Sequence, residues 1–141
     1  MSLRGQIFAA IETILVAACP DEAHVEFMPS GDAQEGIEVA IMDGPMRRIT
    51  GETGSVRREF SFTVHGSLTG VGGGVPVHAA LNDLHATVVD ALLDDPTLGG
   101  LVDLLEDGDS NFDVIPIADM RGIFFTQDFI VQFTAPGGRL S

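Results

Sequence analysis

The segment from Val56 to Leu68 alternates clearly between apolar and polar side chains, and this pattern constrains the fold more than any other feature. Its even positions include Phe60, Phe62 and Val64, whereas its odd positions hold charged or small polar residues. Successive side chains of a strand point to opposite faces of a sheet, so a period of two predicts a strand with one buried face. We therefore expect a sheet whose apolar face is covered by another layer.

Two segments with helical periodicity can supply that layer. Apolar residues recur every three or four positions from Leu3 to Ala18, and Pro20 then ends the pattern. Pro76 opens a second apolar series that reaches Leu92, and proline suits the first turn of a helix. A short third helix is expected over residues 98–106, followed by a turn at 108–111.

Four further segments are predicted strands: His24–Met28, Gly36–Asp43, Phe112–Asp119 and Ile123–Thr134. The last two form an antiparallel hairpin with Gly122 at its turn. The sequence therefore predicts an α+β fold over residues 1–141, as a single domain. Its single antiparallel sheet has about four strands, with two main helices packed on one face.

Residues 44–55 (GPMRRITGETGS) are predicted to form a long loop between two strands. The segment is about twice the length of a usual hairpin connection. It places Arg47 and Arg48 beside Met46 and Ile49 in a chain that is otherwise acidic. A contact loop and a merely mobile loop both fit this composition.

The charge balance limits the classes of partner. The chain has 21 acidic residues against seven basic ones, all arginine, and a formal net charge of −14. A broad basic surface for phosphates is therefore not expected, and neither is specific nucleic-acid binding. No apolar run approaches the roughly 20 residues that span a bilayer, so no membrane partner is expected. The first residues read as mature protein, since no small-residue cleavage region follows them.

No residue pattern predicts catalysis, so the chain is expected not to be an enzyme and to need no cofactor. The glycine-rich stretch 70–75 matches neither phosphate-binding glycine motif, and the chain has no lysine. Cys19 lacks a neighbouring base, and His78 and His85 are two helical turns apart, too far for one metal ion. Both histidines are therefore expected to be ordinary surface residues. Whether His24 and His65 approach each other stays open.

The order of these features resembles the tail terminator family of long-tailed phages and prophages, also called minor tail or tail completion proteins. Four segments carry the resemblance, and together they span most of the chain. They are the helix LRGQIFAAIETIL, the strand RREFSFTVHG, the helix HAALNDLHATVVDALLDDPTLGGLV and the strand DFIVQF.

The resemblance implies a structural protein that forms a hexameric ring, caps the tail tube, ends its polymerisation and allows heads to join. Implied partners are further copies of the chain, the major tail tube protein and a head-completion or connector protein. The implied location is the virion tail, assembled in the cytoplasm of a bacterial host. Candidate contact residues lie in the predicted loop and the following strand: Met46, Arg47, Arg48, Ile49, Arg57, Arg58 and Glu59.

Two alternatives remain at this point. Another phage neck, connector or tail-tube component would share the size and the self-association. A small soluble ligand-binding α+β domain would instead have a pocket where polar groups converge.

Overall fold

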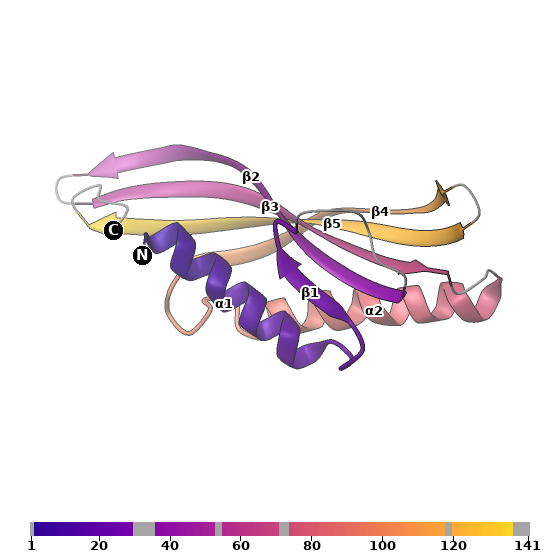
Figure 1. Cartoon of the computed structure of the whole chain (residues 1–141). Helices are drawn as coiled ribbons and strands as arrows, with labels where there is room; N and C mark the ends of the chain where they lie inside the picture. The colour runs from indigo at the N-terminus through magenta and orange to yellow at the C-terminus, as the bar shows by residue number, and fades with distance from the viewer. Residues whose placement is uncertain (1, 30–35, 53–54, 71–73, 118–119, 137–141) are drawn as a thin grey trace.

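The structure, a computed structural model, describes residues 2–29, 36–52, 55–70, 74–117 and 120–136. In these residues the chain forms two helices and one sheet of five strands (Figure 1). The elements are α1 (Leu3–Ala18), β1 (His24–Phe27), β2 (Gly36–Glu52), β3 (Ser55–Thr69), α2 (Val75–Leu93), β4 (Leu104–Ile117) and β5 (Met120–Pro136). The α+β class and the closing β4–β5 hairpin are confirmed, but Gly122 is not at the turn, because it lies within β5 and pairs with Ile115.

The sheet is mixed, so the prediction of about four antiparallel strands was wrong in part. The strand order is β1-β2-β3-β5-β4. The four longer strands pair antiparallel, whereas β1 pairs parallel to β2, with His24 beside Glu38 and Phe27 beside Ile41. Alternation identifies strands but not the direction in which they pair, and four residues in β1 are too few to indicate a register.

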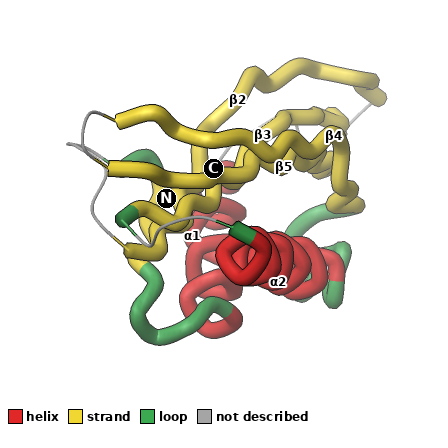
Figure 2. Tube along the Cα trace, turned by 90° about the vertical axis from the view of Figure 1, so that its right-hand side faces the viewer, coloured by secondary structure: helices red, strands yellow, loops and turns green. Residues whose placement is uncertain are grey.

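Both helices cover the same face of the sheet and leave the other face without helices (Figures 1 and 2). α1 begins after Ser2, whose Oγ accepts a hydrogen bond from the Gly5 amide, and it ends at Cys19, just before Pro20. α2 starts with Pro76 in its first turn, as expected. Neither helix in the described ranges is long and apolar enough to span a bilayer.

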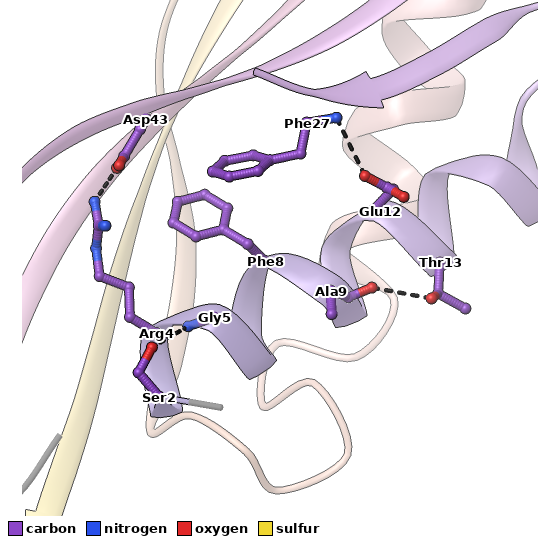
Figure 3. A pocket seen from close by; sticks show the side chains of 9 residues that line it. All are labelled: Ser2, Arg4, Gly5, Phe8, Ala9, Glu12, Thr13, Phe27 and Asp43. Atoms are coloured by element: carbon purple, nitrogen blue, oxygen red, sulfur yellow. Dashed lines mark hydrogen bonds and ion pairs between the residues drawn. The ribbon is translucent and has the colours of Figure 1, made fainter. Parts of the chain in front are cut away.

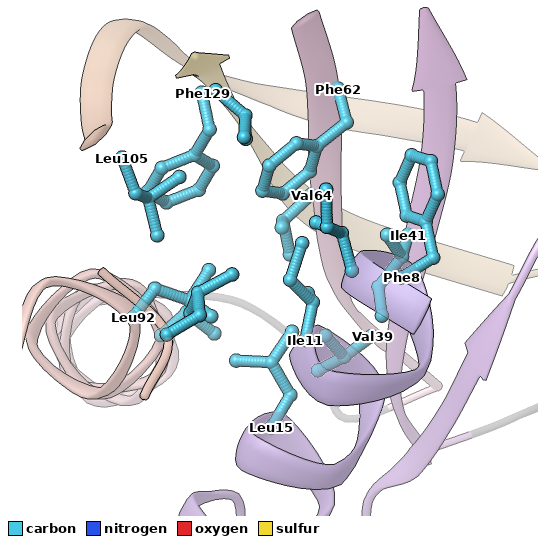
Figure 4. Packing of buried hydrophobic residues seen from close by; sticks show 14 of the residues in the cluster. Phe8, Ile11, Leu15, Val39, Ile41, Phe62, Val64, Leu92, Leu105 and Phe129 are labelled. Atoms are coloured by element: carbon cyan, nitrogen blue, oxygen red, sulfur yellow. The ribbon is translucent and has the colours of Figure 1, made fainter. Parts of the chain in front are cut away.

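The core lies between the sheet and the two helices, where apolar side chains from both layers interlock (Figure 4). The rings of Phe62 on β3 and Phe129 on β5 stack with centroids 5.1 Å apart. Ile11 and Leu15 from α1 and Leu92 from α2 are fully buried against the sheet. The even-numbered face of residues 56–68 is therefore the inner face, as the alternation predicted.

The predicted loop over residues 44–55 is wrong, because most of it is strand. β2 continues to Glu52 and β3 begins at Ser55, so the two strands form one long hairpin. Register shifts between Asp43 and Met46, and between Arg48 and Thr50, mark bulges in β2. Bulges and glycines interrupt the alternation by which a strand is recognised in the sequence. The segment is a strand because its backbone groups bond those of β3, and a side-chain pattern does not show such bonds.

The predicted short helix over 98–106 is also wrong. Leu98, Gly99 and Gly100 have φ values of 50°, 70° and 89°, which a right-handed helix does not allow. The Asp95 carboxylate accepts hydrogen bonds from Thr97 and Gly99 and holds a tight turn, and these bonds lower its pKa. β4 then begins at Leu104. The predicted turn at 108–111 is a bulge within β4, between Asp107 and Ser110.

Candidate assembly surfaces

The helix-free face of the sheet carries polar side chains that bond across the strands. Arg47 on β2 pairs with Glu59 on β3, with Nη2 2.9 Å from Oε1. Gln132 on β5 donates to the other carboxylate oxygen of Glu59 at 3.2 Å. Thr63 donates to Asp128 at 2.8 Å in the same way. These bonds join β2, β3 and β5 into a preformed polar surface.

The seven predicted contact residues lie together in the distal half of the β2–β3 hairpin but divide between its two faces. Arg47 and Glu59 face the helix-free side as cross-strand partners. Met46 pairs with Phe60 and is packed against the core. Arg48 stands opposite Arg58. Arg48, Ile49 and Arg57 are exposed, and Arg58 is half-buried.

A shallow hollow of about 560 Å³ opens near the centre of the sheet, across the bulges of β2 and β4. It is lined in part by Asp43, Asp109 and Asp128, together with Ser61 and Thr63. Three carboxylates with no basic side chain in the lining make this hollow unfavourable for phosphates and other anions.

A second hollow, of about 480 Å³, lies between α1 and the sheet (Figure 3). Arg4 reaches across it to bond the Asp43 carboxylate and the Gly44 carbonyl oxygen, and its guanidinium lies 5.2 Å from the centroid of the Phe8 ring. On the other side, the Glu12 carboxylate accepts a hydrogen bond from the Phe27 amide at 3.1 Å. The polar groups of this hollow thus hold α1 against the sheet.

Arg4 was missed by sequence reasoning. The available signal was a single basic residue in the first turn of a helix that begins an acidic chain. Nothing in the sequence indicated that its partner would be Asp43, 39 positions away.

His85 is not the ordinary surface histidine that was predicted. The centroid of the His85 ring lies 5.0 Å from the ring centroid of Phe112 and 5.0 Å from that of Phe125. The ring also forms a hydrogen bond with the side chain of Gln127. His78 is exposed. The single-strand pattern could not reveal this contact, because Gln127 occupies an inward position that the alternation assigns to an apolar residue.

The remaining candidates for chemistry are occupied by local contacts. His24 bonds Glu26, whereas His65 stacks on Phe124 with ring centroids 5.0 Å apart. Burial lowers the pKa of His65, and the nearby Glu38 opposes that effect. Cys19 is buried, and burial raises the pKa of its thiol, which disfavours the reactive thiolate. Over the described ranges, no three His, Cys, Asp or Glu side chains gather closely enough to hold a metal ion.

No protein-family model matches the chain. No curated protein matches it either. Among solved structures, a chain from one described as "Virion of native gene transfer agent (GTA) particle" is 17% identical to this chain. That match covers 93% of this chain and 92% of the other, with a TM-score of 0.42.

Proposed function

We propose that this chain is a non-enzymatic virion-assembly protein that caps a phage tail tube as a ring of identical subunits. The ring ends polymerisation of the tube protein and presents a surface to which a head-completion or connector protein joins. The sequence supports this role through its resemblance to tail terminators over the two helices and over the strands 57–66 and 128–133.

The observation that carries the proposal is the long β2–β3 hairpin. Its strands have 17 and 15 residues, whereas strands of roughly 5–6 residues are usual. Its distal end continues past the N-terminal end of α1 (Figure 1). Four of the seven arginines lie there: Arg47, Arg48, Arg57 and Arg58. A long, locally basic arm on an acidic subunit suits contact with another protein.

The open sheet face gives the acidic surplus a role in a ring. Glu106 and Asp128 lie on this face, and Asp43, Asp109 and Asp128 line its hollow. If this face lines the channel, its negative charge keeps genomic DNA from adhering as it passes. Replacing Glu106 and Asp128 with Gln and Asn should slow DNA ejection at low salt. Unchanged ejection would remove this part of the proposal.

The test of the capping role is deletion of this gene from the phage or prophage that encodes it. We expect electron microscopy to show overlong, headless tails, and a plasmid copy of the wild-type gene to restore normal particles. Normal tails on filled heads in the deletion strain would overturn the proposal.

A tube or neck component remains the alternative within virion assembly, since the open hairpin edge suits either. The polymer form separates them, because a terminator closes into a ring whereas a tube subunit stacks along the tail. A ligand-binding domain would use one of the two hollows, at the centre of the sheet or beside α1. In the hollow beside α1, Arg4 and Glu12 already bond neighbouring groups, although Nε of Arg4 has no hydrogen-bond partner in the described residues.

A further inference from the structure

The two outer edges of the sheet differ in charge, and both are open over long stretches. On the β2 side, β1 pairs only with Glu38–Ile41, so from Gly44 onward no described strand lies outside β2. On the β4 side, the Leu105 amide bonds the Pro96 carbonyl oxygen, and from Glu106 onward no strand in the described residues lies outside β4. Open edges present unpaired backbone groups to a partner.

The open part of β2 is basic, and the open part of β4 is acidic. Arg47 and Arg48 are exposed on β2. On β4 the exposed charged side chains are Glu106, Asp107, Asp109 and Asp113. Within the described residues Arg48 has no ion-pair partner, and neither do Asp107 and Asp109. Arg47 pairs with Glu59 on β3, so Arg48 is the uncompensated charge of the basic edge, and acidic side chains without ion-pair partners lie on the opposite side of the same subunit.

Three exposed apolar side chains, Ile49, Phe112 and Val114, lie on these open stretches. Phe112 and Val114 are 47% and 51% exposed on adjacent inward positions of β4. Exposed apolar groups gathered with charged ones at an open edge mark a protein contact better than isolated apolar residues do.

The strand directions allow the two edges to meet repeatedly. β2 pairs antiparallel to β3, β3 to β5, and β5 to β4, so β2 and β4 run in opposite directions. A second copy related by rotation about an axis along the strands would thus bring its β2 antiparallel to β4 of the first. Every further copy can join in the same way, and such a head-to-tail contact closes into a ring when the rotation closes.

The register along the strands fixes how the copies must be offset. Asp43 on β2 lies level with Asp107 on β4, because the pairs across the sheet run from Asp43 to Phe62, Phe129 and Asp107. Met46 lies level with Leu105 in the same way, through Phe60 and Val131. The open stretches start at this level and extend to opposite ends of the sheet. Neighbouring copies must therefore shift along the strands, and a closed ring accommodates such a shift by tilting its strands. The shift brings Arg47 and Arg48 to the stretch between Asp107 and Asp113.

We infer that two copies of this chain bind each other through these opposite edges, the basic edge of β2 in one copy against the acidic edge of β4 in the next. This inference rests on the proposed function, since it specifies the contact by which the ring forms.

The test changes the charge of each edge in the full chain. The variant Arg47→Glu with Arg48→Glu has two acidic edges, and Asp107→Arg with Asp109→Arg places two arginines between Glu106 and Asp113 and so cancels the acidic charge of the β4 edge. Each alone should weaken self-association by more than about tenfold in sedimentation velocity. An equimolar mixture should regain assembly in alternating order, and so should one chain that carries all four changes. The variant Asp83→Arg with Asp90→Arg, on exposed positions of α2, changes net charge as much as the β4 variant and should assemble as the wild type does.

Circular dichroism of each variant shows whether it is folded, and restored assembly in the mixture shows that both components are competent. Assembly that is indifferent to both charge changes would overturn the edge contact and leave the capping role standing. A wild-type chain that stays monomeric at all concentrations would also overturn it. The capping role is tested separately, and normal tails in the deletion strain would contradict it. Binding of single-stranded DNA by the wild-type basic edge, in place of self-association, would likewise contradict the inference.

Discussion

His85 on α2 lies with its Nε2 atom 2.8 Å from Oε1 of Gln127 on β5. The Gln127 amide nitrogen donates to the carbonyl oxygens of Gly108 and Asp128, at 3.0 Å each. Because the amide hydrogens are used there, Oε1 is the acceptor, and Nε2 of His85 carries the hydrogen. One buried amide thus links α2 and β5 to the bulge in β4.

Replacing Gln127 with Leu should lower the free energy of unfolding by about 1–3 kcal/mol, because the Gly108 carbonyl and the His85 ring lose a buried partner. Gln132→Leu is the matched control on the same strand, since the Gln132 side chain bonds that of Glu59 on the open face. We expect that control to change stability by less than about 0.5 kcal/mol. Urea unfolding measures both, and equal effects would contradict the linking role of Gln127.

The depressed pKa of His65 predicts a pH dependence of stability. Its folded pKa lies below the ordinary value of about 6.5, so the unfolded chain binds more protons in the window just below that value. Stability from this group is fully present above pH 6.5 and is lost as the pH falls toward the folded pKa. The His65→Asn variant should lose part of this slope in thermal unfolding between about pH 7 and 5. His24→Asn, at an exposed histidine, should keep it. Identical slopes in wild type and His65→Asn would refute the prediction.

Gly66 makes room on β3 for a ring from the neighbouring strand. A Cβ atom at this position would overlap the side chain of Phe125, which is fully buried. Gly66→Ala should therefore destabilise the protein by about 1–3 kcal/mol. Gly108→Ala is the comparison, because a Cβ there would lie 3.5 Å from Asp128 Cβ, an ordinary contact. Differential scanning calorimetry should show a clearly lower melting temperature for Gly66→Ala alone.

Arg48 is predicted to matter for assembly and not for folding. Its side chain is exposed, so Arg48→Ala should change the free energy of unfolding by less than about 0.5 kcal/mol. In the deletion strain, a plasmid copy with this change should yield fewer complete particles than the wild-type copy. Arg57→Ala on the neighbouring strand tests whether any exposed arginine of the hairpin has the same effect. Full rescue by Arg48→Ala would exclude a contact role for this side chain.

Periodicity predicted the parts of the fold that bury one apolar face. α1, α2, the inner face of β3 and the β4–β5 hairpin all follow from spacing and from Pro20 and Pro76. The failures arose where strand pairing or backbone conformation, and not side-chain periodicity, decides the structure. Residues 44–52 form a strand because they pair with β3. The residues from Leu104 onward form a strand because they pair with β5.

The sequence predicted which residues of the hairpin gather at the candidate surface, but not which face of the sheet each one occupies. Composition alone pointed to Arg47 and Arg48, whose charge is unusual in this chain. Their division between two faces follows from the alternation of consecutive strand residues, which could not be applied to a segment read as a loop. The acidic edge of β4 was read as a helix end and a turn, so its relation to the basic edge emerged only from the strand order.

Locating the chain within intact particles tests the central claim most directly. A small tag at an exposed position of α2, such as Asp83, can be labelled and imaged by electron microscopy in purified tails and complete virions. The capping role predicts a single labelled ring at the head-proximal end of each tail tube. Label along the whole tube, or none on the particles, would contradict it.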